Sequence, residues 1–249
     1  MLGQLAVALF TRVLLAPITL PHTILEGGSA PPGGWSLLAR PYEDGARGYF
    51  VHVAPRADAE ASPDEGSPPD PHAIAPEARR DIALQVGAEG MIPVDGVGRL
   101  QARARLLTVA RFDLDTAYAL YLERQPGGSA ASAWSGQTHV TYRFAQGEQA
   151  QFRAGLGLRH WADDAGSTYG LDMLYGVDIF WGRPVTTSLE ATGGWVGHAW
   201  AFGARGTLGL LIGNTEVFAG YDATWLGDMN ANTPAAYLGG PVAGVRVYF

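Results

Sequence analysis

The residues with the clearest chemical potential are ten charged side chains that share one face of alternating segments in the second half of the chain. They are Arg143, Arg153, Arg159, Asp172, Asp178, Glu190, Arg205, Glu216, Asp222 and Arg246. Arginines and carboxylates at such positions either pair with one another or line a narrow polar pore. Unpaired charges in a narrow interior are unfavourable, which favours ion pairs that fill it.

Other reactive residue types give weaker signals. His139, His160 and His198 lack the close spacing of a zinc motif, so we predict no metal and no cofactor. Ser188 and Glu190 share one face of a segment, and His139 lies on the corresponding face of another. Because no nucleophile motif accompanies them, we predict no catalytic residues and no enzyme, and a lipid-modifying hydrolase is the less favoured alternative.

Composition excludes several classes of protein. The chain has 249 residues, 34 of them glycine, and a net charge of −7, which argues against nucleic acid as a partner. It contains no cysteine, which rules out disulfides and thiolate metal sites. Outside an N-terminal stretch, no apolar run reaches the roughly 20 residues of a membrane-spanning helix.

From Arg79 onward, polar and apolar residues alternate in runs separated by turn residues, and helical periodicity is not sustained. The candidate strands are residues 80–92, 98–108, 112–123, 137–145, 149–161, 169–181, 185–195, 199–212, 216–225 and 237–249. Each has about the 9–11 residues of a tilted membrane strand or slightly more. We therefore predict an all-β, transmembrane, antiparallel up-and-down β-barrel over residues 79–249, with about ten strands (eight or twelve are the alternatives).

The connections between these strands alternate in length. Residues 109–111, 146–147, 182–184 and 213–215 are tight turns, whereas residues 124–136, 162–168 and 226–236 are predicted to form long loops. Residues 196–198 form a short connection at a position where the alternation predicts a long loop. Short periplasmic turns and longer extracellular loops are typical of outer-membrane barrels.

The chain ends inside a strand. Residues 237–249 alternate and stop on Phe249, so we expect this strand to close the barrel against the first one. The ending resembles the C-terminal signature of bacterial outer-membrane barrels. That resemblance implies the barrel-assembly machinery as a partner, which would act on this strand.

Three observations favour an apolar outer face against lipid over an apolar core. The apolar face carries no charge, and a charge there would be unfavourable by about 2–4 kcal/mol at the bilayer midplane. The charged face is interleaved with glycines, which make room for long side chains. The large aromatic residues fall at strand ends, as in a membrane-interface girdle. One rim would hold Trp161, Tyr169, Trp195, Trp200, Trp225 and Tyr237, and the other Trp181 and Phe249.

Two segments precede the predicted barrel. Residues 1–30 are apolar but contain Arg12 and Pro17, and we interpret them as an atypical export signal. A misassigned start codon or an ordinary helix are the alternatives. Residues 31–78, rich in Pro, Gly and Asp, are predicted to be a linker with a possible short hairpin at residues 35–55.

Residues 138–249 resemble a group of uncharacterised outer-membrane β-barrel proteins of bacteria such as myxobacteria. The resemblance lies in residues 142–146 (YRFAQ), 152–157 (FRAGLG), 175–180 (YGVDIF), 217–222 (VFAGYD) and 239–246 (GGPVAGVR). It implies a barrel in the bacterial outer membrane, and it implies no activity.

These observations lead to one functional prediction and its alternatives. We expect an outer-membrane barrel, in contact with outer-membrane lipid, whose charged lumen is largely plugged. At about ten strands, side chains are expected to fill the interior. Its role would be structural, or surface interaction through the long loops at residues 124–136 and 226–236. A small passive pore or transporter with an arginine- and carboxylate-lined lumen is the alternative.

Overall fold

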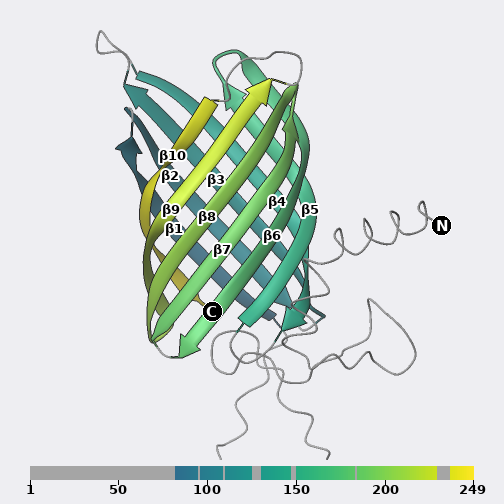
Figure 1. The fold of residues 1–249 in the computed structure, drawn as a ribbon, viewed down its shortest axis with the longest axis vertical. Helices are drawn as coiled ribbons and strands as arrows, with labels where there is room; N and C mark the ends of the chain where they lie inside the picture. Colours follow the sequence, from purple (N-terminus) through teal and green to yellow (C-terminus); the bar gives the residue numbers. More distant parts are fainter. Residues whose placement is uncertain are drawn as a thin grey trace, which may run out of the picture.

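The computed structural model describes residues 82–94, 96–108, 110–124, 130–146, 150–182, 184–228 and 236–249 (Figure 1). The proposed export signal, linker and short hairpin lie outside these residues. Within them, ten segments are β-strands. Their bounds are β1 Ile82–Val94, β2 Val97–Thr108, β3 Phe112–Arg124, β4 Ala130–Gln146, β5 Ala150–Asp163, β6 Gly166–Gly182, β7 Val185–Val196, β8 Ala199–Ile212, β9 Thr215–Asp228 and β10 Ala236–Tyr248. The same residues contain no helix that is both long and apolar enough to span a membrane.

The ten strands form a closed barrel in which each strand pairs antiparallel with its neighbours in sequence. β1 and β10 pair with each other, which closes the sheet. The last residue takes part in this closure. The Phe249 N–H donates to the Leu84 carbonyl at 2.8 Å, and the Leu84 N–H donates back at 3.2 Å. The predicted up-and-down topology, the strand number and closure by the C-terminal strand are therefore confirmed.

The prediction of long loops was wrong at two places. β4 begins at Ala130, so most of residues 124–136 belong to a strand. β5 continues to Asp163 and β6 begins at Gly166, so a short turn replaces the loop predicted at residues 162–168. These extensions are rich in Ala, Ser and Gly, which have little preference for strands. Backbone pairing with the neighbouring strands nevertheless keeps them extended.

Alternation along the strands sorts side chains between the two faces of the barrel wall. On β6, Leu171 and Met173 point outward and are 53% and 62% exposed, whereas Asp172 between them is 1% exposed. On β5, Leu156 is exposed and Arg153 is fully buried. Apolar residues thus cover the outside and charged residues fill the inside. This arrangement is the reverse of a water-soluble barrel.

Candidate functional site: the charged barrel interior

All ten charged residues singled out from the sequence lie inside the barrel, and none is more than 8% exposed. The structure adds six more charged residues, from the first three strands, to the same interior. They are Glu89, Arg99, Arg103, Arg105, Asp113 and Asp115. The sequence reasoning assigned faces mainly on the later strands and missed these six. Inward and outward residues also alternate along residues 82–124, and this alternation was the sequence signal that could have identified them.

Positive and negative charges are equal in number among these sixteen side chains. The arginines are Arg99, Arg103, Arg105, Arg143, Arg153, Arg159, Arg205 and Arg246. The carboxylates are Glu89, Asp113, Asp115, Asp172, Asp178, Glu190, Glu216 and Asp222. Each arginine has a carboxylate partner, which offsets the unfavourable transfer of these charges from water.

The central cluster consists of Arg103, Arg105, Asp115, Arg153, Asp178 and Glu190. Two arginines bind Glu190: Arg103 Nη2 lies 2.6 Å from its Oε1, and Arg153 Nη2 lies 2.8 Å from its Oε2. Strands β2 and β7, which carry Arg103 and Glu190, are five positions apart in either direction around the barrel. The side chains of Arg103 and Glu190 therefore extend from opposite walls and meet inside the lumen.

Asp178 accepts several hydrogen bonds within the central cluster. Its Oδ2 accepts from Arg153 Nη1 at 2.7 Å and from Arg105 Nη1 at 3.0 Å. Its Oδ1 accepts from Ser188 at 2.7 Å, and Gln151 also donates to Oδ2 at 3.1 Å. Side chains from β2, β5, β6 and β7 thus meet on one carboxylate. Such shared, charge-assisted hydrogen bonds hold the strands in a single arrangement.

A second group, the seam cluster, consists of Glu89, Arg99, Arg205 and Asp222. Arg99 Nη2 lies 2.9 Å from Glu89 and 3.0 Å from Asp222. Arg205 Nη1 donates to the same two carboxylates, at 2.7 Å to Glu89 and 3.2 Å to Asp222. Glu89 and Arg99 come from β1 and β2, whereas Arg205 and Asp222 come from β8 and β9. The cluster therefore links the two sides of the β1–β10 junction.

Smaller sets complete the interior. Asp172 accepts hydrogen bonds from Arg159 at 2.9 Å and lies 3.1 Å from His139 Nε2. Arg246 pairs with Glu216 at 3.2 Å, and the guanidinium of Arg246 also lies over the ring of Phe218 at 4.4 Å.

Two cavities among these side chains are small. A cavity of about 40 Å³ lies among residues that include Arg99, Tyr121 and Glu190, and one of about 10 Å³ lies near Gln85 and Arg246. Volumes of this size hold one or a few water molecules. The residues around both cavities are largely polar, as ordered water requires.

Most of the predicted girdle residues lie on the outer wall near the barrel ends. The exposed ones are Tyr169, Trp181, Trp195, Trp200, Tyr237 and Phe249. Trp225 is half-buried against Phe202 and Tyr237. The placement of Trp161 was wrong. It shares the inward face of β5 with Arg159, and its ring packs on Tyr121 at 5.6 Å. Its nearness to a strand end suggested a girdle role, but its position in the alternation directs it inward.

The serine and histidine considered for catalysis have different partners. Ser188 donates to Asp178, whereas His139 contacts Asp172. In the part of the chain that the structure describes, no three His, Asp or Glu side chains are placed to hold a metal ion.

No family model matches the chain. No curated protein matches it either. Among solved structures, an anion-selective porin from Comamonas acidovorans aligns with 12% sequence identity and a TM-score of 0.32. The alignment covers 64% of this chain and 57% of the porin, so this chain spans less than two thirds of the porin's length.

Proposed function

We propose that this protein is a bacterial outer-membrane β-barrel whose lumen is closed by its own ion pairs, with a structural or surface-interaction role. The observation that carries the proposal is the Arg103–Glu190 contact across the lumen, which is joined by Arg153 and Asp178. A side-chain network that reaches from wall to wall obstructs the path of an ion at that level, and the two cavities described among these side chains are small. The protein is therefore a plug rather than a pore.

The outer wall supports placement in a membrane. Among the side chains that the structure describes, outward-facing strand positions carry no arginine, aspartate or glutamate. Large apolar residues are exposed there on every side. Their exposure is unfavourable in water and favourable against acyl chains. Trp181 and Trp195 lie near opposite ends of this apolar surface, as interfacial aromatics do.

Two further parts of the proposal concern partners and chemistry. The C-terminal strand, with Phe249 at its end, would be the segment that the barrel-assembly machinery recognises. We also propose that Ser188 and His139 have no catalytic role, since they contact separate carboxylates rather than each other. Lipid turnover that disappears on Ser188→Ala would contradict this.

Conductance in planar lipid bilayers tests the closed lumen. We expect the refolded protein to insert, to show heat-modifiable gel migration, and to produce no conductance steps. Regular steps from the unmodified protein would refute the plug and support the alternative of a small passive pore.

Glu190→Ala tests whether the same network stabilises the barrel. Because it removes the nearest carboxylate of Arg103 and one of the two that bind Arg153 closely, we expect a loss of about 3–5 kcal/mol in the free energy of unfolding. Leu189→Ala is the matched control, since Leu189 is the outward neighbour on β7 and 46% exposed. It should have a much smaller effect on urea-induced unfolding. Equal effects of the two substitutions would contradict a stabilising network.

A further inference from the structure

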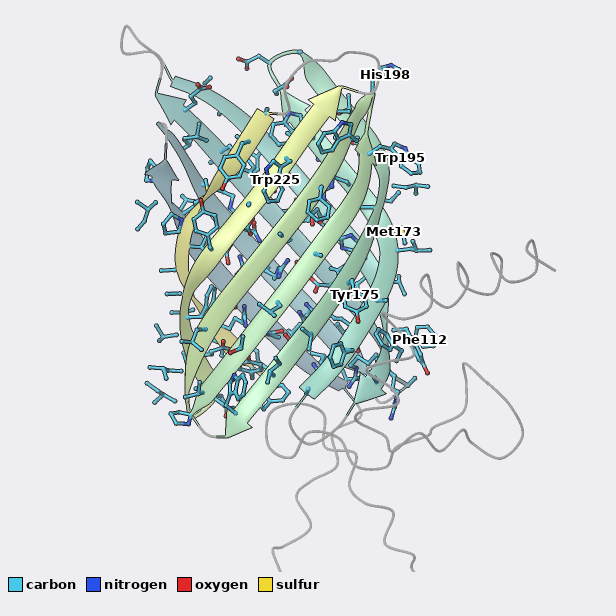
Figure 2. The ribbon with its side chains drawn as sticks, viewed as in Figure 1. Phe112, Met173, Tyr175, Trp195, His198 and Trp225 are labelled. Atoms are coloured by element: carbon cyan, nitrogen blue, oxygen red, sulfur yellow. The ribbon has the colours of Figure 1, made fainter. Side chains whose placement is uncertain are left out.

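The two interior cavities, of about 40 and about 10 Å³, adjoin each other. They share three lining residues, which are Gln101, Arg103 and Arg205. Figure 2 shows nitrogen and oxygen atoms between the strands inside the barrel, whereas Met173 and Trp195 project from the outer face of the wall. The two cavities therefore follow one another within the charged lumen.

Together the cavities extend over most of the length of the lumen. The smaller one, the lower cavity, is lined by Gln85 and Arg246, close to the start of β1 and the end of β10 at the lower end in Figure 1. The larger one, the upper cavity, is lined by Ser135 and Thr224, which lie near the upper ends of β4 and β9. The shared residues lie between these two groups and form a constriction.

The upper cavity is bordered by polar side chains that take no part in the ion pairs. Four of them form no side-chain hydrogen bond with any residue that the structure describes, namely Gln101, Ser135, Gln137 and Thr224. Gln101 and Gln137 point inward but are only half-buried, whereas Arg153 is fully buried. A buried water molecule makes about three hydrogen bonds to polar groups, and these amides and hydroxyls supply them. We therefore expect ordered water in this cavity.

Gln101 is the movable side chain at the constriction. Its two neighbours there are held in place, because Arg103 binds Glu190 and Arg205 binds Glu89. Gln101 has no such partner in the described part of the chain, so its amide can rotate without breaking a hydrogen bond. Rotation of the amide lets a water molecule pass from one cavity to the other.

The same passage is unfavourable for ions. Its lining carries both signs of charge, with Arg103, Arg205 and Glu190 at the upper cavity and Glu89 and Arg246 at the lower one. An ion of either sign would meet like charges, and at a constriction of this size it would also lose most of its hydration shell. A water molecule has no net charge and can exchange hydrogen bonds along the lining.

We propose that water molecules cross the lumen in single file through these two cavities, past Gln101, and that ions do not. The protein is thus a narrow water pathway in addition to the role proposed above. The constriction lies between the central cluster, which contains Arg103, and the seam cluster, which contains Arg205. This inference rests on the proposed membrane placement and on the proposed closure of the lumen to ions.

Stopped-flow light scattering tests the pathway in phosphatidylcholine vesicles that contain the refolded protein and are mixed with hypertonic sucrose. We expect these vesicles to shrink faster than protein-free vesicles. Ala119→Leu should abolish the difference, because Ala119 lies between Gln101 and Ser135 in the strand register and a leucine there fills the upper cavity. Ala102→Leu is the matched control, since it adds the same side chain to an exposed outward alanine on β2. Vesicles with this control should shrink as fast as those with the unmodified protein.

Gln101→Ala tests the constriction itself. Loss of the amide widens the connection between the two cavities, so we expect these vesicles to shrink faster than those with the unmodified protein. Planar bilayers should still show no conductance steps, because the ion pairs of Arg103 and Arg205 remain. An unchanged or slower rate of shrinkage would overturn the assignment of Gln101 as the constriction.

Heat-modifiable migration and flotation with the vesicles are measured on every variant, so that folding and membrane insertion are assessed separately. If Ala119→Leu does not fold, Ala119→Val replaces it as a smaller obstruction. Inserted protein whose vesicles shrink no faster than protein-free vesicles would overturn the water pathway alone, as would equal rates for Ala119→Leu and Ala102→Leu. Conductance steps from the unmodified protein would instead refute the closed lumen, and a chain that does not insert would refute the membrane placement.

Discussion

Gly176 lies on the inner face of β6, between two charged residues that bind each other over it. In the register, Gly176 is paired with Arg153 on one side and Glu190 on the other. The Arg153 guanidinium passes over this strand to reach Glu190, and a Cβ at Gly176 would lie 2.7 Å from Arg153 Cζ. The glycine is thus required for space, since the arginine is held at both ends and cannot move aside.

Gly176→Ala should therefore destabilise the barrel. Displacement of the guanidinium breaks a buried, charge-assisted hydrogen bond, and we expect a loss of about 1–3 kcal/mol in the free energy of unfolding. Gly90→Ala is the control, because Gly90 faces outward and its new Cβ would meet Leu100 at 3.9 Å, an ordinary contact. It should be neutral or slightly stabilising in the same urea titration. A neutral Gly176→Ala would show that Arg153 has another route to Glu190.

Among the strands, the junction of β1 and β10 has the shortest backbone ladder. Its register runs over seven pairs, from Gln85–Tyr248 to Met91–Val242, whereas β5 and β6 form fourteen pairs. Pro93 and Pro241 follow and precede this ladder, and proline has no N–H to donate. The seam cluster compensates from inside the barrel, because it joins β1 and β2 to β8 and β9.

Amide hydrogen exchange in micelles should reveal this difference between junctions. We expect the amides of β10 to exchange faster than those of β6, because fewer backbone bonds must open. Glu89→Gln, which weakens the seam cluster, should increase exchange further in β1 and β10 and leave β5 and β6 unchanged. Acceleration spread evenly over all strands would mean that the cluster stabilises the barrel globally rather than at this junction.

At the scale of the whole molecule, the even strand number places both ends of the barrel segment on one side. β1 begins and β10 ends at the lower end in Figure 1, and the turn at residues 213–214 lies there too, since the Tyr248 N–H donates to the Asn214 carbonyl at 2.9 Å. The turn at residues 164–165 connects β5 and β6 at the opposite end. We propose that the lower end, which carries the tight turn predicted at residues 213–215, faces the periplasm.

Cysteine labelling in whole cells tests this orientation. The chain has no cysteine, so Asp164→Cys and Asn214→Cys each introduce a single reactive thiol in an exposed turn. We expect a membrane-impermeant maleimide to label Asp164→Cys in intact cells and Asn214→Cys only after lysis. The reverse pattern would invert the topology, and labelling of both in intact cells would argue against insertion.

Much of the barrel was predictable because its signal is local. The pleat of a strand sends successive side chains to opposite faces, so Leu171, Asp172 and Met173 could be assigned to outside, inside and outside from their order alone. The strand bounds at residues 124–136 could not be predicted in this way, because Ala, Ser and Gly have little intrinsic preference for strand structure. Trp161 shows that parity along the strand is a better guide to direction than nearness to a strand end.

Amino-acid order alone thus predicted strands, a number of about ten, the charged inner face of the later strands and the closing role of Phe249. Closure of the sheet decided the rest, because it brings together residues that no local pattern relates. Arg103 and Glu190 are 87 positions apart and meet only because β2 and β7 lie on opposite sides of a ten-strand barrel. The outward alanines Ala191, Ala204 and Ala223 likewise lie side by side only through the register, which aligns them from three different strands. Pairing partners are set by global geometry, and the alternation of a single strand does not encode them.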